Sequence, residues 1–204
     1  HGVGGADGGG WAVGGRPSLR VIVGLRCEGR GAPPEGAALI APKQQSAWET
    51  LAFTLILDRP AFIMKRSLLW APPYGPYLAK AGMVAIDRSG GAKTIRAMMS
   101  AAADMAATGR PIVIFPEGTR KAPHAAPDYQ SGVAALYRGL DAPLVPVALN
   151  SGVFWGRNSF IKRPGVIVVE FLDPIEPGLD RRSFMALLED RIETATRRLV
   201  EESE

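Results

Sequence analysis

The chain has 204 residues, which is enough for one domain with a substantial core. Hydrophobic residues make up 47% of it and charged residues 22%, so the composition predicts a globular chain and not a disordered one. A net charge of +4 favours an anionic ligand or an anionic membrane surface. We expect no nucleic-acid partner, because the sequence has no Lys/Arg run and no interleaving of basic and aromatic residues.

Soft ligands and long apolar stretches are both scarce. Cys27 is the single cysteine, which excludes an internal disulfide, and with two histidines it leaves too few ligands for a structural zinc site. We therefore expect no metal.

No uncharged apolar stretch reaches the roughly 18 residues needed to span a bilayer. Whether an anchor precedes His1 stays open.

Residues 1–16 are rich in glycine, and such a segment cannot recover the entropy lost on ordering. We therefore predict a flexible tail over 1–16 and one domain over 17–204, because no linker or repeat divides the rest of the chain.

Predicted strands and helices alternate from residue 19 onward. The segment 111–115 is apolar on both faces, as expected for a central strand covered by helices. The pattern predicts one α/β domain with a mixed, largely buried sheet flanked by helices. In chain order the elements are a strand over 19–27, a short apolar run over 37–41, a helix over 46–57, a strand over 61–64, a Pro/Tyr-rich loop, a strand over 83–86, a helix over 92–108, a strand over 111–115, a helix over 132–140, strands over 144–149 and 166–171, and a helix over 180–200.

A group of polar residues directly follows the predicted central strand, in the segment FPEGTR over 115–120. A strand that stops at Pro and turns on Gly presents backbone N–H groups, a hydroxyl, a carboxylate and a guanidinium at one sheet edge. Arg suits bidentate phosphate binding, and Glu can hold either the Arg or a substrate hydroxyl. From composition alone, an ordinary turn with a surface Glu–Arg pair explains the segment at least as well.

FPEGTR resembles the third motif of the PlsC-type glycerolipid acyltransferases, the family of 1-acylglycerol-3-phosphate O-acyltransferases. The segment 82–88, which ends in Ile-Asp-Arg, is similar to the second motif of that family, and 145–150 resembles the fourth. The order and separations fit over about 19–200. The resemblance implies a glycerol-phosphate acyltransferase-like fold. It also implies transfer of a fatty acyl group from acyl-CoA or acyl-ACP to the free hydroxyl of 1-acylglycerol-3-phosphate, forming phosphatidic acid in phospholipid synthesis.

The resemblance also implies partners and a location. No cofactor is expected, since the acyl-CoA or acyl-ACP is a co-substrate. The expected partners are lysophosphatidic acid, an acyl thioester and a membrane surface, with acyl carrier protein as a further candidate. The expected location is the cytoplasmic face of the inner membrane, peripheral or anchored by a segment absent from this chain. The apolar, aromatic segment 67–74 fits an acyl tunnel or a membrane interface, and equally a packed loop.

The first motif of the family is His, four residues, then Asp, and it falls on Gln44 and Glu49. By resemblance, the His is the general base for the acceptor hydroxyl and the acid orients it. Glu49 keeps the carboxylate on a longer arm, but the amide of Gln44 cannot accept the proton of a hydroxyl in this pH range. We therefore predict strongly reduced acyl transfer. The alternative is a non-catalytic protein that binds lipid phosphate or an acyl carrier.

Glu49 has a structural interpretation as well. Ser46 to Glu49 fits the S-x-x-E capping box, in which Glu49 reaches back to the N–H of Ser46. Capping and a retained catalytic role are equally weighted. Lys43 is predicted to point to the opposite face of the strand from Gln44. His124 is interpreted as a solvated loop histidine and not as a replacement base.

Phosphate recognition is predicted to be better preserved than catalysis. The resemblance places two arginines, Arg88 and Arg120, where the family holds the acceptor phosphate, and Lys65 lies on the strand before the second motif. Each of these cations is otherwise an ordinary surface residue. The predicted substrate-binding residues are Lys65, Arg88, Glu117, Gly118, Thr119 and Arg120.

Overall fold

The structure is a computed structural model that describes residues 11–12, 24–66, 83–86, 91–157 and 159–204. Its described strands form one 8-stranded sheet in the order β1-β2-β8-β7-β3-β6-β4-β5. The elements are β1 Trp11–Ala12, β2 Leu25–Arg30, β3 Leu39–Pro42, α2 Trp48–Ile56, β4 Ala61–Lys65, β5 Val84–Ile86, α4 Gly91–Ala107, β6 Ile112–Ile114, α5 Gly132–Leu140, β7 Leu144–Leu149, α6 Ser151–Phe154, β8 Gly165–Phe171 and α7 Arg181–Glu201.

The sheet is mixed, as predicted. Its neighbours β7, β3, β6, β4 and β5 run parallel to one another, with Leu39 of β3 paired to Ile112 on one side and to Leu144 on the other. β8 runs antiparallel to β7, and β2 is parallel to β8. The carboxyl ends of the five parallel strands therefore meet at one edge, which is where open α/β sheets place their ligands.

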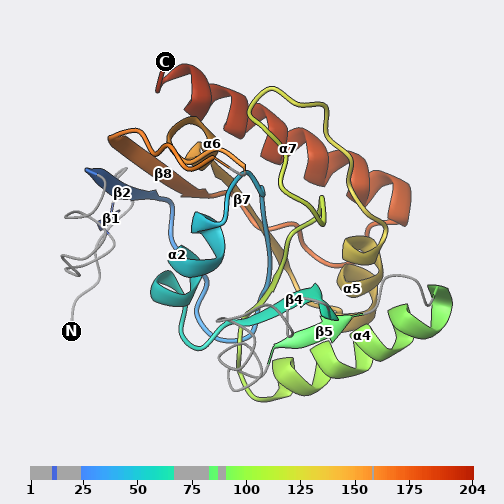
Figure 1. Ribbon diagram of the computed structural model, residues 1–204. Helices are drawn as coiled ribbons and strands as arrows, with labels where there is room; N and C mark the ends of the chain where they lie inside the picture. Colours follow the sequence, from blue (N-terminus) through green and yellow to red (C-terminus); the bar gives the residue numbers. More distant parts are fainter. Residues whose placement is uncertain (1–10, 13–23, 67–82, 87–90, 158) are drawn as a thin grey trace.

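Helices cover both faces of the sheet (Figure 1). α2 packs on one face, and α4, α5 and α7 pack on the other. β6 contacts both layers, because Ile112 and Ile114 face the α4–α5–α7 side and Val113 faces the α2 side. This confirms the prediction of a central strand that is apolar on both faces. One face of α7 is buried as well, at Phe184, Leu188, Ile192, Ala195 and Leu199.

Several expectations differ in detail from the structure. The short helix α6 was not predicted. The first strand of the domain was predicted over 19–27, whereas β2 begins at Leu25, and 19–23 lie outside the described residues. Within the predicted tail 1–16, Trp11–Ala12 pairs antiparallel with β2, and the remainder of the tail lies outside the described residues. The aromatic segment 67–74 also lies outside them. Where the structure describes the chain, no helix is both long and apolar enough to cross a bilayer.

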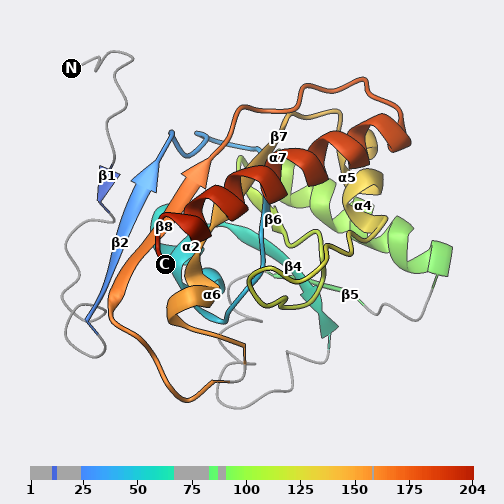
Figure 2. The same ribbon diagram turned by 90° about the horizontal axis from the view of Figure 1, so that it is seen from above.

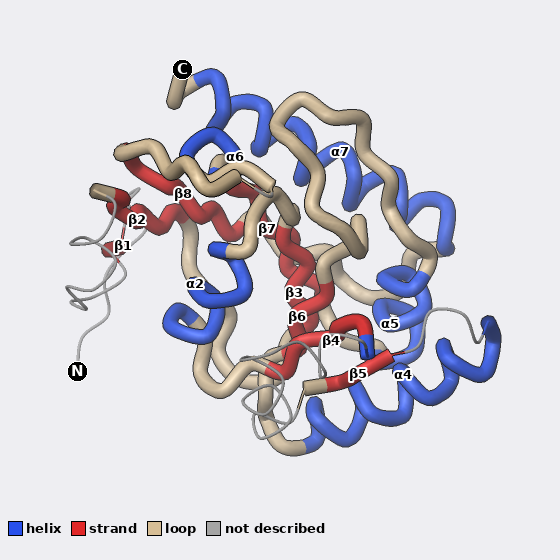
Figure 3. The backbone as a smooth tube through the Cα atoms, viewed as in Figure 1, coloured by secondary structure: helices blue, strands red, loops and turns tan. Residues whose placement is uncertain are grey.

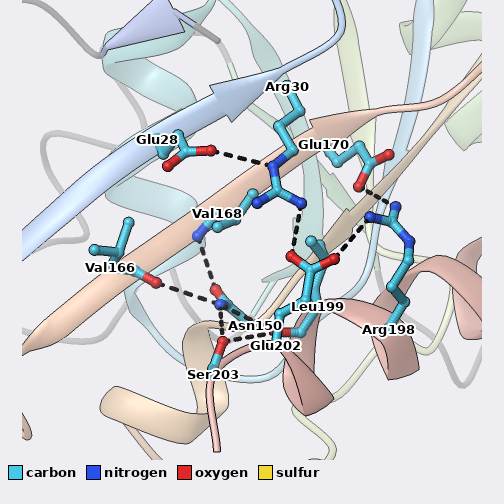
Figure 4. Close-up of polar contacts among 10 residues, drawn as sticks. All are labelled: Glu28, Arg30, Asn150, Val166, Val168, Glu170, Arg198, Leu199, Glu202 and Ser203. Carbon is cyan, nitrogen blue, oxygen red and sulfur yellow. Dashed lines mark hydrogen bonds and ion pairs between the residues drawn. The ribbon is translucent and has the colours of Figure 1, made fainter. Parts of the chain in front are cut away.

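The end of α7 is tied to the sheet by polar contacts (Figure 4). The side-chain oxygen of Asn150 accepts a hydrogen bond from Val168 N at 2.8 Å, and its Nδ2 donates to Ser203 Oγ at 2.7 Å. Arg30 of β2 also reaches α7, with its Nη1 2.8 Å from Glu202 Oε2. These contacts hold α7 in one position across the sheet, and that position decides which of its side chains reach the carboxyl edge.

Candidate active site

The segments that resemble the first and third motifs meet at the carboxyl edge. Gln44 follows β3, and the FPEGTR segment over 115–120 follows the neighbouring strand β6. Gln44 N donates to Glu117 Oε2 at 3.2 Å, and Lys121 N donates to Gln44 O at 2.9 Å. Gln44 is thereby held on both sides by the segment after β6.

FPEGTR forms a tight turn that separates its charged groups. Gly118 N donates to Phe115 O at 3.0 Å, with Pro116 in the second position of the turn and Gly118 at a φ of 62°, a left-handed value that suits glycine. Glu117 points inward and is buried, whereas Thr119 is exposed and Arg120 is half-buried. The expectation of a surface Glu–Arg pair is therefore wrong, because Glu117 pairs with a buried lysine.

That lysine is Lys43, whose side chain is 2% exposed. Its Nζ lies 2.9 Å from Glu117 Oε1 and 2.6 Å from Glu193 Oε1 on α7, and the hydroxyl of Tyr129 donates to the same Glu193 oxygen at 2.9 Å. The loop that carries Tyr129 runs along α7 (Figure 3). Burial raises the pKa of the Glu117 carboxyl, and the Lys43 ammonium acts against that rise. The network joins β3, the FPEGTR turn and α7.

The ion pairs of Lys43 were not predicted, although its position on the α7 side follows from the alternation along β3. Residues that alternate along a strand share one face, and Leu39 and Ala41 both face the α7 side. Lys43 continues this series and so meets α7. A signal existed in the sequence: a lysine that extends a buried alternation needs a carboxylate partner, because an unpaired buried charge is costly.

Glu49 is fully buried, and its contacts confirm that it reaches back to the N–H of Ser46. The N-cap of α2 is Ala47, however, and not Ser46 as predicted. Ser46 N donates to Glu49 Oε1 at 2.8 Å and to Oε2 at 3.0 Å, and Gln45 N donates to Oε1 at 3.0 Å. In return, Ser46 Oγ accepts from Trp48 N at 2.9 Å. Ser151 of α6 donates its hydroxyl to Glu49 Oε1, a contact that was not predicted. Both carboxylate oxygens are thus engaged at the starts of α2 and α6.

The two neighbouring amides have different environments. Gln45 is buried, and its side-chain oxygen accepts from Gly152 N at 2.9 Å, so it helps to position α6. The side chain of Gln44 is half-buried and has no hydrogen bond to any other part of the chain that the structure describes. Gln44 is therefore the amide that is available to a ligand at the sheet edge.

The other predicted residues lie along the same edge or outside the description. Lys65 is exposed at the end of β4, and β6 separates that strand from β3. Arg120 accepts a hydrogen bond at its backbone oxygen from Arg157 Nη1 at 3.1 Å. Arg88 lies outside the described residues. His124 is exposed, with its Nε2 3.2 Å from Glu204 Oε1, in agreement with a loop histidine.

The sequence model of the acyltransferase family matches residues 24–150, which cover β2 to β7 and both joined segments of the site. The chain belongs to the acyltransferase family. A protein from Pseudomonas aeruginosa named 1-acyl-sn-glycerol-3-phosphate acyltransferase is 34% identical over 74% of this chain and 59% of that protein. A protein from Homo sapiens named 1-acyl-sn-glycerol-3-phosphate acyltransferase alpha is 30% identical over 65% of this chain and 48% of that protein.

This acyltransferase domain thus spans less than two thirds of the length of these curated relatives. Its fold matches a solved structure, the 1-acyl-sn-glycerophosphate (LPA) acyltransferase PlsC from Thermotoga maritima, with a TM-score of 0.71 at 16% identity over 89% of this chain and 74% of that chain. The family match ends at Asn150, but Ser151 and Glu193 lie beyond it and still contact the site residues. The last quarter of the acyltransferase domain therefore completes the site.

The protonation of Glu49 makes stability depend on pH. Burial raises the pKa of Glu49 from its usual 4.5 to about 7, and hydrogen bonds, first that from Ser151, act against the rise. The folded domain binds this proton more tightly than the unfolded chain does. The contribution of protonated Glu49 to the free energy of unfolding is therefore full below pH 4.5 and is lost as pH rises through about 7. We expect Glu49→Gln to remove this part of the pH dependence, on the order of 3 kcal/mol.

The measurement is urea unfolding of both proteins at a series of pH values between 4.5 and 8. Ser151→Ala is the matched variant, since removing its hydrogen bond raises the pKa of Glu49 further and extends the loss of stability to higher pH. If plots of the free energy of unfolding against pH run parallel for the unsubstituted protein and the Glu49→Gln protein, Glu49 does not titrate in this range.

Proposed function

We propose that this domain transfers a fatty acyl group from an acyl thioester to the free hydroxyl of 1-acylglycerol-3-phosphate, forming phosphatidic acid. Family membership and the printed names of the relatives support this reaction. The observation that carries it is the closure of the FPEGTR turn around Gln44, through Glu117 and Lys121. This closure joins the proposed position of the base to the segment proposed to bind phosphate.

The residues divide into two proposed roles. Arg120 and Lys65, with Arg88 by resemblance, bind the acceptor phosphate, for which guanidinium and ammonium groups are suited. Gln44 accepts a hydrogen bond from the acceptor hydroxyl through its amide oxygen. In the reaction the hydroxyl oxygen bonds to the thioester carbonyl carbon, the C–S bond breaks, and the hydroxyl proton passes through solvent to the departing thiolate, which leaves as a free thiol. Gln44 orients the hydroxyl but cannot take that proton, so we expect slow transfer.

A second candidate is a domain that binds the lysophospholipid without acylating it. The half-buried side-chain amide of Gln44 favours this function. By resemblance it stands where the family has its base, and it forms no hydrogen bond with the described residues. For acyl transfer we propose acyl-CoA or acyl-ACP as the thioester. For either candidate we propose the cytoplasmic face of the inner membrane as the location.

Both candidates require phosphate binding, which an arginine substitution tests. We expect Arg120→Ala to weaken the binding of lysophosphatidic acid about 10- to 100-fold, since a charge-assisted hydrogen bond contributes about 1.5–3 kcal/mol. Isothermal titration calorimetry at a lipid concentration below micelle formation measures the Kd. The matched control is Arg138→Ala, an exposed arginine in the last turn of α5, which leads into the amino end of β7.

The Arg138→Ala protein is expected to bind as the unsubstituted protein does. Equal affinity in the Arg120→Ala protein would contradict the phosphate role of the FPEGTR turn. Incubating the unsubstituted protein with radiolabelled acyl-CoA and lysophosphatidic acid then separates the two candidates: formation of phosphatidic acid above the protein-free rate identifies transfer, and binding alone identifies the second candidate.

A further inference from the structure

The segment between α6 and β8 presents two adjacent apolar side chains to solvent. Phe160 is 102% exposed and Ile161 is 75% exposed. Single exposed apolar residues are common on soluble proteins. Two adjacent side chains of this size at the tip of one loop remain mostly exposed, and this arrangement favours a partner that covers them.

The loop is also strongly cationic. Arg157, Lys162 and Arg163 flank the apolar tip, and the sequence from 151 to 164 contains no Asp or Glu. Lys162 Nζ lies 4.7 Å from the centre of the Trp155 ring, so this cation and an aromatic ring pack together at the base of the loop. Apolar tip residues surrounded by cations are typical of surfaces that enter the interface of an anionic bilayer.

Hydrogen bonds within the loop hold the tip outward. Arg163 N donates to Phe154 O at 2.9 Å and closes the base of the loop. Ser159 N donates to Gly156 O at 3.2 Å, and Ile161 N donates to Ser159 Oγ at 3.1 Å. The orange segment between α6 and β8 extends away from the sheet in Figure 2. The shape of the loop is therefore set before any partner binds.

The loop is coupled to the candidate active site. Arg157 Nη1 donates to the backbone oxygen of Arg120 at 3.1 Å, next to the turn proposed to bind phosphate. The same loop lines a cavity of about 680 Å³ together with Pro123, Ser203 and Glu204. A surface that covered the tip would therefore lie on the side of the domain where Arg157 contacts the FPEGTR turn.

We propose that this loop, residues 159–163 with Arg157, docks the domain on the surface of an anionic phospholipid bilayer. Phe160 and Ile161 enter the acyl boundary, and the cations contact lipid headgroups. The side chains of Leu51 and Leu55 on α2 are also exposed, but that helix contains no Lys or Arg that could contact anionic headgroups beside them. The docking goes beyond the proposed acyl transfer, since it requires no turnover.

Vesicle binding tests the proposal directly. The 204-residue protein is sedimented with vesicles of phosphatidylglycerol and phosphatidylcholine, and with vesicles of phosphatidylcholine alone. We expect Phe160→Ser with Ile161→Ser to lower partitioning onto the anionic vesicles roughly 100-fold, and Lys162→Ser with Arg163→Ser to lower it roughly 10-fold. Leu51→Ser with Leu55→Ser is the matched control and is expected to bind as the unsubstituted protein does.

Three results would overturn the docking surface: no binding of the unsubstituted protein to anionic vesicles, full binding by the Phe160–Ile161 variant, or an equal loss in the Leu51–Leu55 control. A thermal melt of each variant excludes unfolding as the cause of a loss. Because vesicle binding is read without turnover, its failure is separate from failure of the proposed acyl transfer. If the domain binds anionic vesicles but forms no phosphatidic acid, the docking proposal stands and the proposed acyl transfer is contradicted.

Discussion

Gln44→His is expected to raise the rate of acyl transfer by about 10²- to 10⁴-fold. An imidazole at this position accepts the proton of the acceptor hydroxyl near neutral pH, whereas the amide of Gln44 only accepts a hydrogen bond. The position is already held by the contacts of Gln44 N with Glu117 and of Gln44 O with Lys121, which are backbone contacts at residue 44 and survive the substitution. Release of free coenzyme A thiol from acyl-CoA with lysophosphatidic acid measures the rate.

The matched control is Gln44→Asn, which keeps an amide, gains no base and is therefore expected not to raise the rate. Equal rates in the unsubstituted protein and the Gln44→His protein would show that residue 44 is not the position of the base. If Gln44→His leaves the protein inactive while Arg120→Ala still weakens lipid binding, the non-catalytic function is the correct one.

Lys43→Met is expected to destabilise the domain by about 3–5 kcal/mol. The substitution leaves Glu117 buried without its cation and removes a partner from Glu193 on α7. Removing one member of a buried ion pair is costly because the remaining charge stays desolvated. Urea unfolding at pH 7 measures the change, and we expect the Lys43→Met, Glu117→Gln double variant to recover part of it, since the uncompensated charge is gone.

Lys121→Met provides the matched control. Lys121 forms a more exposed ion pair, with its Nζ 3.9 Å from Asp128 Oδ2, and such pairs contribute about 0–1 kcal/mol. A loss in the Lys43→Met protein no larger than in the Lys121→Met protein would contradict the buried network. So would a double variant that is less stable than the single one, because removing the charge of Glu117 would then bring no relief.

Local patterns predicted most helices and strands closely. The helices predicted over 92–108 and 180–200 are α4 and α7, with each end displaced by one residue. The spacing of their apolar residues indicates that one face of each helix is buried. This pattern is local, because it can be read within a few helical turns. α6 was missed because four residues carry too little periodicity to show a face. Its Ser151 therefore could not be assigned as a partner of Glu49.

Pairings across the sheet were not predictable from such patterns. The spacing of apolar residues shows that a strand is buried but not which strand lies beside it. The antiparallel placement of β8 against the parallel group β7-β3-β6-β4-β5 depends on how α6 and the loop that follows it return the chain. The prediction could name a mixed sheet but not its order.

The sequence by itself determined that the FPEGTR turn and Gln44 follow strands of one α/β domain, and it led to the prediction that a proton acceptor is missing at residue 44. It also determined the capping role of Glu49, because Ser46 and Glu49 lie three residues apart. Only the tertiary structure decided the partner of Glu117. Lys43 is 74 residues from Glu117 and 150 residues from Glu193, and contacts over such separations depend on strand order and helix packing.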